Sequence, residues 1–243
     1  VLWEEASIDV LGVPFFVMEQ IQGRVPPDIP PYVFGGWLFD ATPESQLQLQ
    51  ELCVGIIAQL HQIKQKSPDT DFLEFHTKGD TALKRHFTNQ KEYYYWVVQD
   101  SRQHPVIEQA FDWLESHWPE ESESVLSWGD ARIGNIMFDS KTLEPVAVLD
   151  WEMAGLAPVE VDLGWMIFMH KFFQLIAEAL EFPGMPKFMT SRDVTSKFTD
   201  LTGIVPKNID WFEIYAATRH AIIMSRINDR SVHFGESEWT DDV

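Results

Sequence analysis

The amino-acid sequence predicts an α+β fold in which helices predominate and one β-hairpin interrupts them near the middle of the chain. Several stretches repeat apolar residues every three to four positions, the spacing of a helix with one buried face. Residues 136–151 break this period, because the short apolar runs NIMF and PVAVLDW flank the polar turn DSKTLE, as in a hairpin. The chain has 243 residues, of which 45% are hydrophobic, so it can bury the core of one large domain or two small ones.

The N-terminal part is predicted to contain strand and loop. Residues 10–21 are rich in β-branched and aromatic types with Gly12 and Pro14 between them, which indicates two short strands or one bent strand. Residues 22–37 are dense in proline and glycine. We interpret them as an ordered loop or as a substrate or lid loop.

Helices are predicted over much of the remaining chain. Thr42 is a suitable N-cap and Pro43 a suitable first residue for a helix whose apolar stripe runs to about Gln65. A polar loop follows at residues 67–80, and the acidic residues 233–243 are expected to fray. Five further helices are predicted, over residues 89–101, 105–118, 161–180, 190–201 and 210–227.

Composition excludes several classes of function. The formal net charge of -20 disfavours nucleic acid and anionic membranes as partners. The single cysteine, Cys53, excludes a disulfide framework and favours a cytoplasmic location. No apolar run is long enough to span a bilayer, and the acidic N-terminus lacks the basic region of a signal peptide. Because the sequence does not begin with methionine, we interpret it as a fragment or a processed product.

Three side chains around the predicted hairpin carry the candidate chemistry. Asp130 and Asn135 lie in the loop WGDARIGN before the first strand, and Asp150 ends the second strand in VLDWE. Folding of the hairpin brings Asp150 beside Asn135, so that amide and carboxylate oxygens converge as Mg²⁺ ligands. Asp130 is then left at the tip of the loop, free to accept a proton from a substrate hydroxyl. This division of tasks is what phosphoryl transfer requires.

These strings resemble the aminoglycoside phosphotransferase-like kinases, a family that includes choline and homoserine kinases. The family pattern is His-Gly-Asp-x₄-Asn, then a hydrophobic strand and Asp-Trp-Glu, and this chain has Trp128-Gly129-Asp130-x₄-Asn135 followed by VAVLDWE. The resemblance implies that Asp130 is the catalytic base and that Asn135 and Asp150 bind Mg²⁺. It also implies transfer of the γ-phosphate of ATP to a hydroxyl of a small molecule.

The longer strings WGDARIGNIMF and VLDWEMAGLAPVEVDLGW resemble the branch of this family that accompanies acyl-CoA dehydrogenases. The branch suggests a hydroxyacyl thioester as substrate, whereas the net acidity suits an aminoglycoside-like or choline-like cation. Asp162 is expected to buttress the catalytic loop or to be an ordinary carboxylate at a helix N-terminus. Arg132 is expected to contact the transferred phosphate or substrate, or to pair with a carboxylate such as Asp162.

Two features depart from the family pattern. Trp128 replaces the family histidine and could pack in the same place. The stretch LGVPFFVMEQIQGR resembles the last strand and hinge of a small kinase N-lobe, which implies that Val17, Met18, Glu19 and Gln20 meet adenine. No lysine precedes Lys64 and no glycine-rich loop precedes Gly12.

The resemblance thus implies a protein-kinase-like fold whose N-lobe is largely absent. Residues 1–22 would be the remnant of that lobe, and residues 23–243 the helical C-lobe with the catalytic loop and metal site. A non-catalytic nucleotide- or ligand-binding module on the same C-lobe is the alternative. A protein kinase is a weaker one, because no Ala-Pro-Glu segment follows Asp150. The oligomeric state is not readable from the sequence.

Overall fold

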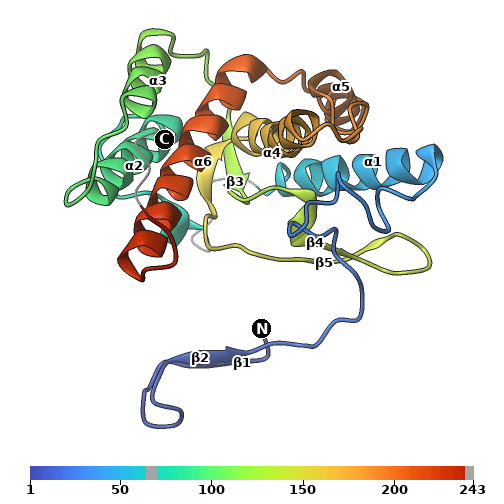
Figure 1. The fold of residues 1–243 in the computed structure, drawn as a ribbon, viewed down its shortest axis with the longest axis horizontal. Coiled ribbons are helices and arrows are strands. Elements are labelled where there is room, and N and C mark those ends of the chain that lie inside the picture. The colour runs from blue at the N-terminus through green and yellow to red at the C-terminus, as the bar shows by residue number, and fades with distance from the viewer. Residues whose placement is uncertain (64–69, 239–243) are drawn as a thin grey trace.

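The computed structural model describes residues 1–63 and 70–238, and it consists of a helical body with an N-terminal arm that projects from it (Figure 1). The arm is a two-stranded antiparallel sheet of β1 (Trp3–Glu5) and β2 (Phe15–Val17). Only β2 falls within the predicted strand region, and its partner lies upstream because residues 8–13 form the turn between them. The apolar side chains of the arm are largely exposed.

The proline-rich segment after the arm is an ordered loop, which was one of its two interpretations. Tyr32, Val33 and Leu38 from this loop are buried in the body. Arg24 forms a β-bridge with Phe138, since the backbone N–H of each residue donates to the carbonyl of the other at 2.9 and 2.8 Å. The loop is therefore fastened to the strand that follows the predicted catalytic loop.

Helix α1 (Pro43–Leu60) begins as predicted, because the hydroxyl of Thr42 accepts a hydrogen bond from the backbone N–H of Ser45. It ends at Leu60, earlier than the predicted Gln65, which lies outside the described residues together with part of the predicted polar loop. Asp71–Leu73, within that loop, forms a short 3₁₀ helix.

Helix α2 (Ala82–Val97) begins well before the predicted residue 89. Thr81 is its N-cap and accepts from the N–H of Lys84, so the polar first turns belong to the helix. Helix α3 (Pro105–Ser116) matches its prediction closely.

The predicted hairpin is confirmed, and a second strand pair surrounds it. Strands β4 (Ile136–Phe138) and β5 (Pro145–Val148) are antiparallel, with Ile136 opposite Val148. Outside them, β3 (Ser124–Ser127) pairs with β6 (Gly155–Pro158), which was not predicted. The predicted catalytic loop therefore runs from β3 into β4, through a 3₁₀ turn at Ile133–Asn135.

Three helices complete the body: α4 (Glu160–Ala179), α5 (Ser191–Thr202) and α6 (Ile209–His233). Helix α6 is longer than predicted and continues to His233, where fraying was expected to begin; residues 239–243 lie outside the described part. Helices α4 and α6 pack closely enough that a Cβ on Gly164 would lie 2.8 Å from the Phe212 backbone.

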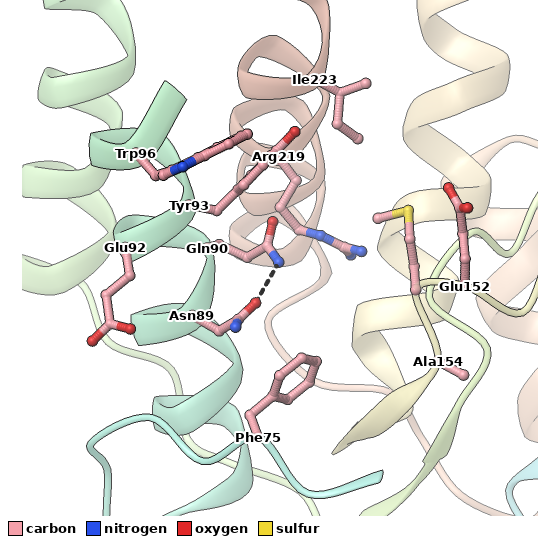
Figure 2. Close-up of a pocket in the computed structure, with 11 residues that line it drawn as sticks. Phe75, Asn89, Gln90, Glu92, Tyr93, Trp96, Glu152, Ala154, Arg219 and Ile223 are labelled. Atoms are coloured by element: carbon pink, nitrogen blue, oxygen red, sulfur yellow. Dashed lines mark hydrogen bonds between the residues drawn. The ribbon is translucent and has the colours of Figure 1, made fainter. Parts of the chain in front are cut away.

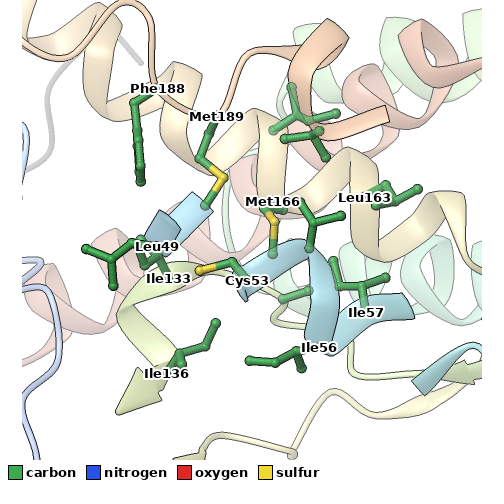
Figure 3. Packing of buried hydrophobic residues seen from close by; sticks show 14 of the residues in the cluster. Leu49, Cys53, Ile56, Ile57, Ile133, Ile136, Leu163, Met166, Phe188 and Met189 are labelled. Carbon is green, nitrogen blue, oxygen red and sulfur yellow. The ribbon is translucent and has the colours of Figure 1, made fainter. Parts of the chain in front are cut away.

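The core lies between α1, the catalytic loop and α4. Leu49, Cys53 and Ile57 of α1 point toward Ile133, Ile136 and Met166 (Figure 3). The loop that carries Asp130 is thus anchored on apolar packing. None of the helices in the described ranges is long and apolar enough to cross a membrane.

Candidate active site

Asp130 is a buried carboxylate held by three donors. The indole nitrogen of Trp165 donates to Oδ1 at 2.6 Å. Oδ2 accepts from the Asn135 amide at 2.7 Å and from Nε of Arg132 at 3.0 Å. The sequence predicted a free carboxylate at the tip of a loop. The structure instead places Asp130 in the interior, because α4 lies over the loop and supplies Trp165.

Asp162, in the first turn of α4, supports the backbone at the start of the loop that carries Asp130. Its carboxylate accepts the hydroxyl of Ser127 at 2.8 Å and the backbone N–H groups of Trp128 at 2.8 Å and Gly129 at 2.9 Å. Burial raises the pKa of Asp162, and these three donors oppose that rise. The expected buttress is therefore present, and the same carboxylate also lies at a helix N-terminus.

Gly129 is required by the shape of the loop. Its φ of +89° lies in the left-handed region, and a Cβ at this position would lie 2.1 Å from the carbonyl oxygen of Met153. The loop therefore passes directly against the segment that follows Asp150.

Trp128 links the loop that carries Asp130 to the backbone of Leu149 and Asp150. The indole is fully buried, and its N–H donates to the carbonyls of Leu149 at 2.9 Å and Asp150 at 3.1 Å. This tryptophan occupies the position of the expected histidine and fixes the backbone on either side of the Leu149–Asp150 peptide bond. The expectation that it packs within the loop agrees with this geometry.

The hairpin brings Asn135 and Asp150 together at its base. The backbone N–H of Leu149 donates to the Asn135 carbonyl at 2.8 Å, so Asp150 follows directly after that pair. Asp150 does not end the strand as predicted: β5 stops at Val148, and Asp150 adopts a φ of +60° with an exposed side chain.

The side-chain chemistry at the base of the hairpin fits a hard cation. The Asn135 Nδ2 donates to Asp130, which leaves the amide oxygen available, and the Asp150 carboxylate is exposed. Amide and carboxylate oxygens are Mg²⁺ ligands, and water completes the shell of a site with few protein ligands. Within the described ranges, no cluster of three or more His, Cys, Asp or Glu side chains forms a closed metal site.

Arg132 pairs with Asp28 and Asp130, not with Asp162 as one of our alternatives suggested. Asp28 comes from the proline-rich loop, so the ion pair joins that loop to the catalytic loop. Burial lowers the pKa of Arg132, but the two carboxylates raise it above its usual value. The guanidinium is therefore firmly charged beside Asp130.

Arg219 of α6 was not predicted as part of the site. Its Nη2 donates to the carbonyl of Gly129 at 3.1 Å, and its guanidinium lies 4.5 Å from the centre of the Trp165 ring. A charged residue inside the apolar stretch AATRHAII was the available signal. Its neighbour His220 packs against Phe172 with ring centroids 4.5 Å apart.

The candidate adenine-binding residues lie on the arm, apart from Asp130, Asn135 and Asp150. Val17 ends β2, and Met18, Glu19 and Gln20 follow it with exposed side chains. Figure 1 shows the arm extending away from the helical body that contains β3, β4 and β5. The structure does not bring these four residues against Asp130.

A cavity of about 560 Å³ opens beside the catalytic loop, between α2, α6 and the segment after Asp150 (Figure 2). Phe75, Tyr93 and Trp96 form apolar walls, and the buried Arg219 of α6 lies beneath the surface of the cavity. The cavity therefore shares Arg219 with the loop that carries Asp130.

The sequence over residues 1–182 matches the phosphotransferase enzyme family. The chain belongs to this family. The match includes the predicted catalytic loop, the hairpin and Asp162. Family membership agrees with the resemblance drawn from the motifs around Asp130 and Asp150.

Curated relatives of this phosphotransferase chain include acyl-CoA dehydrogenase family member 11 of Pongo abelii and of Homo sapiens. Each is 31% identical over 160 residues, which is 65% of this chain and 19% of the relative. The chain thus spans about a fifth of the length of these relatives. Their names match the branch suggested by the longer motifs.

Solved structures share the fold of this family member. A Ralstonia eutropha protein described as an aminoglycoside phosphotransferase superposes with a TM-score of 0.71 at 22% identity, over 95% of this chain and 68% of that one. A macrolide 2'-phosphotransferase of type I superposes with a TM-score of 0.52 at 15% identity, and the match covers 90% of this chain and 64% of that one. The chain therefore has a kinase-like phosphotransferase fold of mixed helix and strand.

Proposed function

We propose that this chain forms the catalytic part of an ATP-dependent phosphotransferase that transfers the γ-phosphate to a hydroxyl of a small molecule. The observation that carries the proposal is the arrangement of Asp130 beside Asn135, with Asp150 at the base of the same hairpin. A carboxylate held rigidly beside two oxygen ligands meets the two needs of phosphoryl transfer, a proton acceptor and a cation site.

Asp130 would accept the proton of the attacking hydroxyl. A carboxylate offers roughly four lone-pair positions, and Trp165, Asn135 and Arg132 occupy three of them. As the hydroxyl oxygen bonds to the γ-phosphorus, the bond from that phosphorus to the β–γ bridging oxygen breaks. The proton moves to Asp130 and ADP leaves.

Asn135 and Asp150 would hold Mg²⁺ through their side-chain oxygens. When bound, the cation neutralises charge on the phosphates. The hydrogen bonds from Trp128 to the Leu149 and Asp150 carbonyls support this role, because they fix the backbone that presents the carboxylate.

Arg132 would stabilise charge on the transferred phosphate. Its Nε and Nη1 bind Asp130 and Asp28, and the side chain remains partly exposed beside the proposed base. Adenine would meet the backbone of Val17, Met18, Glu19 and Gln20, with residues 1–22 as the remnant of a small lobe and residues 23–243 as the large one.

Titration with MgATP tests this function, with thermal stabilisation of the protein as the readout. We expect Asp150→Ala to abolish Mg²⁺-dependent nucleotide binding, while Asp139→Ala, at the exposed hairpin turn, preserves it. An unchanged nucleotide affinity in Asp150→Ala would refute the assignment of Asp150.

A non-catalytic ligand-binding module is the second candidate. The exposure of Val17–Gln20 on an arm remote from Asp130 favours it. Ligand binding without any release of ADP across a panel of hydroxyl compounds would support the module, and release of ADP that depends on Asp130 would support the enzyme.

A further inference from the structure

The guanidinium of Arg132 binds two carboxylates through different nitrogen atoms. Nε donates to Oδ2 of Asp130 at 3.0 Å, and Nη1 donates to Oδ2 of Asp28. Nη2 has no acceptor among the described residues and retains contact with solvent, and the side chain as a whole is 20% exposed. One donor therefore serves the proposed base, one serves the proline-rich loop, and one is free.

Asp28 is held in place by the turn in which it lies. Asp28 and Pro31 form an isolated β-bridge, and the backbone N–H of Tyr32 donates to the carbonyl of Pro27 at 2.9 Å. Tyr32 is buried, and its hydroxyl donates to Nδ1 of His170 on α4 at 2.9 Å. The turn that carries Asp28 is therefore anchored on the same helix that supports the loop of residues 128–135.

The ion pair also packs tightly against that loop. A Cβ on Gly134 would lie 2.6 Å from Nη1 of Arg132 and 2.8 Å from Oδ1 of Asp28. The cavity bounded by the pair, Tyr32 and His170 measures only about 10 Å³, roughly the space of one water molecule. Neither a ligand nor another side chain can separate Asp28 from Arg132 from this side.

The bond between Arg132 and Asp130 differs from the usual pairing of these groups. A guanidinium commonly binds a carboxylate through two parallel N–H bonds. Here Asp130 receives only Nε, and its other oxygen accepts from Trp165. Because Asp28 holds Nη1, the guanidinium cannot turn to give Asp130 a second bond. Such a bond would occupy the lone-pair position that the proposed function leaves for the substrate hydroxyl.

We infer that Asp28 is a positioning residue for phosphoryl transfer. It holds Arg132 so that Nε supports the base, while Nη2 stays free for the transferred phosphate. Asp28 acts through Arg132 and needs no contact with either substrate. The inference deepens the proposed function and rests on it, because it assigns to the proline-rich loop a part in the same reaction.

Steady-state rates of ADP release from MgATP test the inference, with water alone and with a panel of hydroxyl compounds as acceptors. Asp28→Ala should lower kcat about tenfold or more and leave the KM for ATP within about twofold, because it misplaces a group that acts in the transition state. Asp40→Ala is the matched control, since Asp40 is an exposed acid shortly after the loop with no side-chain partner among the described residues. Equal kcat values in Asp28→Ala and the control would overturn the inference.

A double-mutant cycle separates positioning through Arg132 from a general structural role. Arg132→Met removes the guanidinium, so addition of Asp28→Ala to it should lower kcat by less than about twofold further. Two effects that multiply in full would overturn the inference. Asp28→Asn replaces Asp28→Ala if the latter does not fold, because it preserves the shape and weakens the charge-assisted bond. Full kcat in Asp28→Asn would then overturn the inference.

A measurement without nucleotide separates the inference from the proposed function. The ¹⁵N NMR signal of the Arg132 Nε–H, identified by its loss in Arg132→Met, should shift in Asp28→Ala and not in Asp40→Ala. An unchanged signal in Asp28→Ala would overturn the inference. A shifted signal, with no ADP release by the unmodified protein, would refute the phosphotransferase and leave Asp28 in control of Arg132. ADP release that Asp28→Ala leaves unchanged would refute the positioning role alone.

Discussion

The indole nitrogen of Trp165 donates a 2.6 Å hydrogen bond to Oδ1 of Asp130. Trp165 lies on α4, the helix that also carries Asp162 and so holds the backbone of the same loop. One helix therefore both supports the loop of residues 128–135 and orients the carboxylate of Asp130. The ring of Trp165 is stacked in turn by Arg219 from α6, which extends this support to the last helix.

Trp165→Phe should lower phosphotransfer while the protein stays folded. The change keeps an aromatic ring for Arg219 and removes the donor to Asp130. A hydrogen bond to a charged group is worth about 1.5–3 kcal/mol, so loss of its orienting effect predicts a turnover reduced about tenfold. ADP release with MgATP measures the effect. Trp113→Phe, at a half-exposed tryptophan on α3, is the control, and equal rates in both variants would speak against this role.

Trp128→Phe tests the link between the loop and the cation site. Phenylalanine fills most of the buried space but cannot donate to the carbonyls of Leu149 and Asp150. We expect the Mg²⁺ concentration for half-maximal activity to rise several-fold as Asp150 becomes less fixed. An Mg²⁺ dependence identical to that of the unmodified protein would show that the two bonds do not position the carboxylate.

Gly129→Ala should destabilise the fold strongly. The left-handed φ alone costs about 1–2 kcal/mol for a residue with a Cβ, and the contact with the Met153 carbonyl adds to it. Urea unfolding should show a total loss of about 3 kcal/mol or more. Gly35→Ala is the control, because a Cβ there meets nothing within 4 Å. Equal stability of both variants would contradict the described loop geometry.

The convergence of Asn135 and Asp150 could be predicted because it depends on local pattern. A short turn between two apolar runs places the ends of a hairpin side by side whatever surrounds them. The donors that hold Asp130 could not be predicted in the same way. Trp165 and Arg219 reach the site only through the packing of α4 and α6, and nothing in their local sequence specifies that contact.

The other differences between the sequence-based predictions and the structure also arise from contacts between distant segments or from weak local patterns. The pairing of β3 with β6 joins segments on either side of the hairpin, and the short strand Ser124–Ser127 has little apolar signal. The start of α2 was missed because its first turns are polar and its N-cap, Thr81, lies in a polar stretch. Arg132 was expected to contact the phosphate or substrate, or to pair with a carboxylate such as Asp162. Its partner Asp28 comes instead from a loop more than a hundred residues away.

The buried side chain of His170 should make the free energy of unfolding depend on pH. Its Nδ1 accepts from Tyr32 and its Nε2 donates to the Met185 carbonyl, and burial lowers its pKa from 6.5 to about 4. Between pH 6.5 and 4 the unfolded chain takes up a proton that the folded chain does not. Neutral His170 therefore makes its full contribution to the free energy of unfolding above pH 6.5. This contribution is lost as the pH falls toward 4, which lowers the free energy of unfolding by about 3 kcal/mol in all.

His170→Gln keeps both hydrogen bonds and removes the titrating group. The free energy of unfolding, measured by urea at several pH values, should therefore fall less steeply from pH 6.5 to 4 in this variant. Part of the slope should persist, because burial also lowers the pKa of His86. Identical slopes in the two proteins would contradict a neutral, buried His170.

We propose Asp130 as the proton acceptor in the transfer of phosphate from MgATP to a hydroxyl. The most direct measurement is the rate of ADP release by Asp130→Asn beside the unmodified protein, with an acceptor found in a panel of hydroxyl compounds. Asparagine preserves the size of the side chain but cannot take the proton. We expect a turnover lower by roughly 10²–10⁴-fold with nucleotide binding retained, and full activity in Asp130→Asn would show that Asp130 is not the proton acceptor.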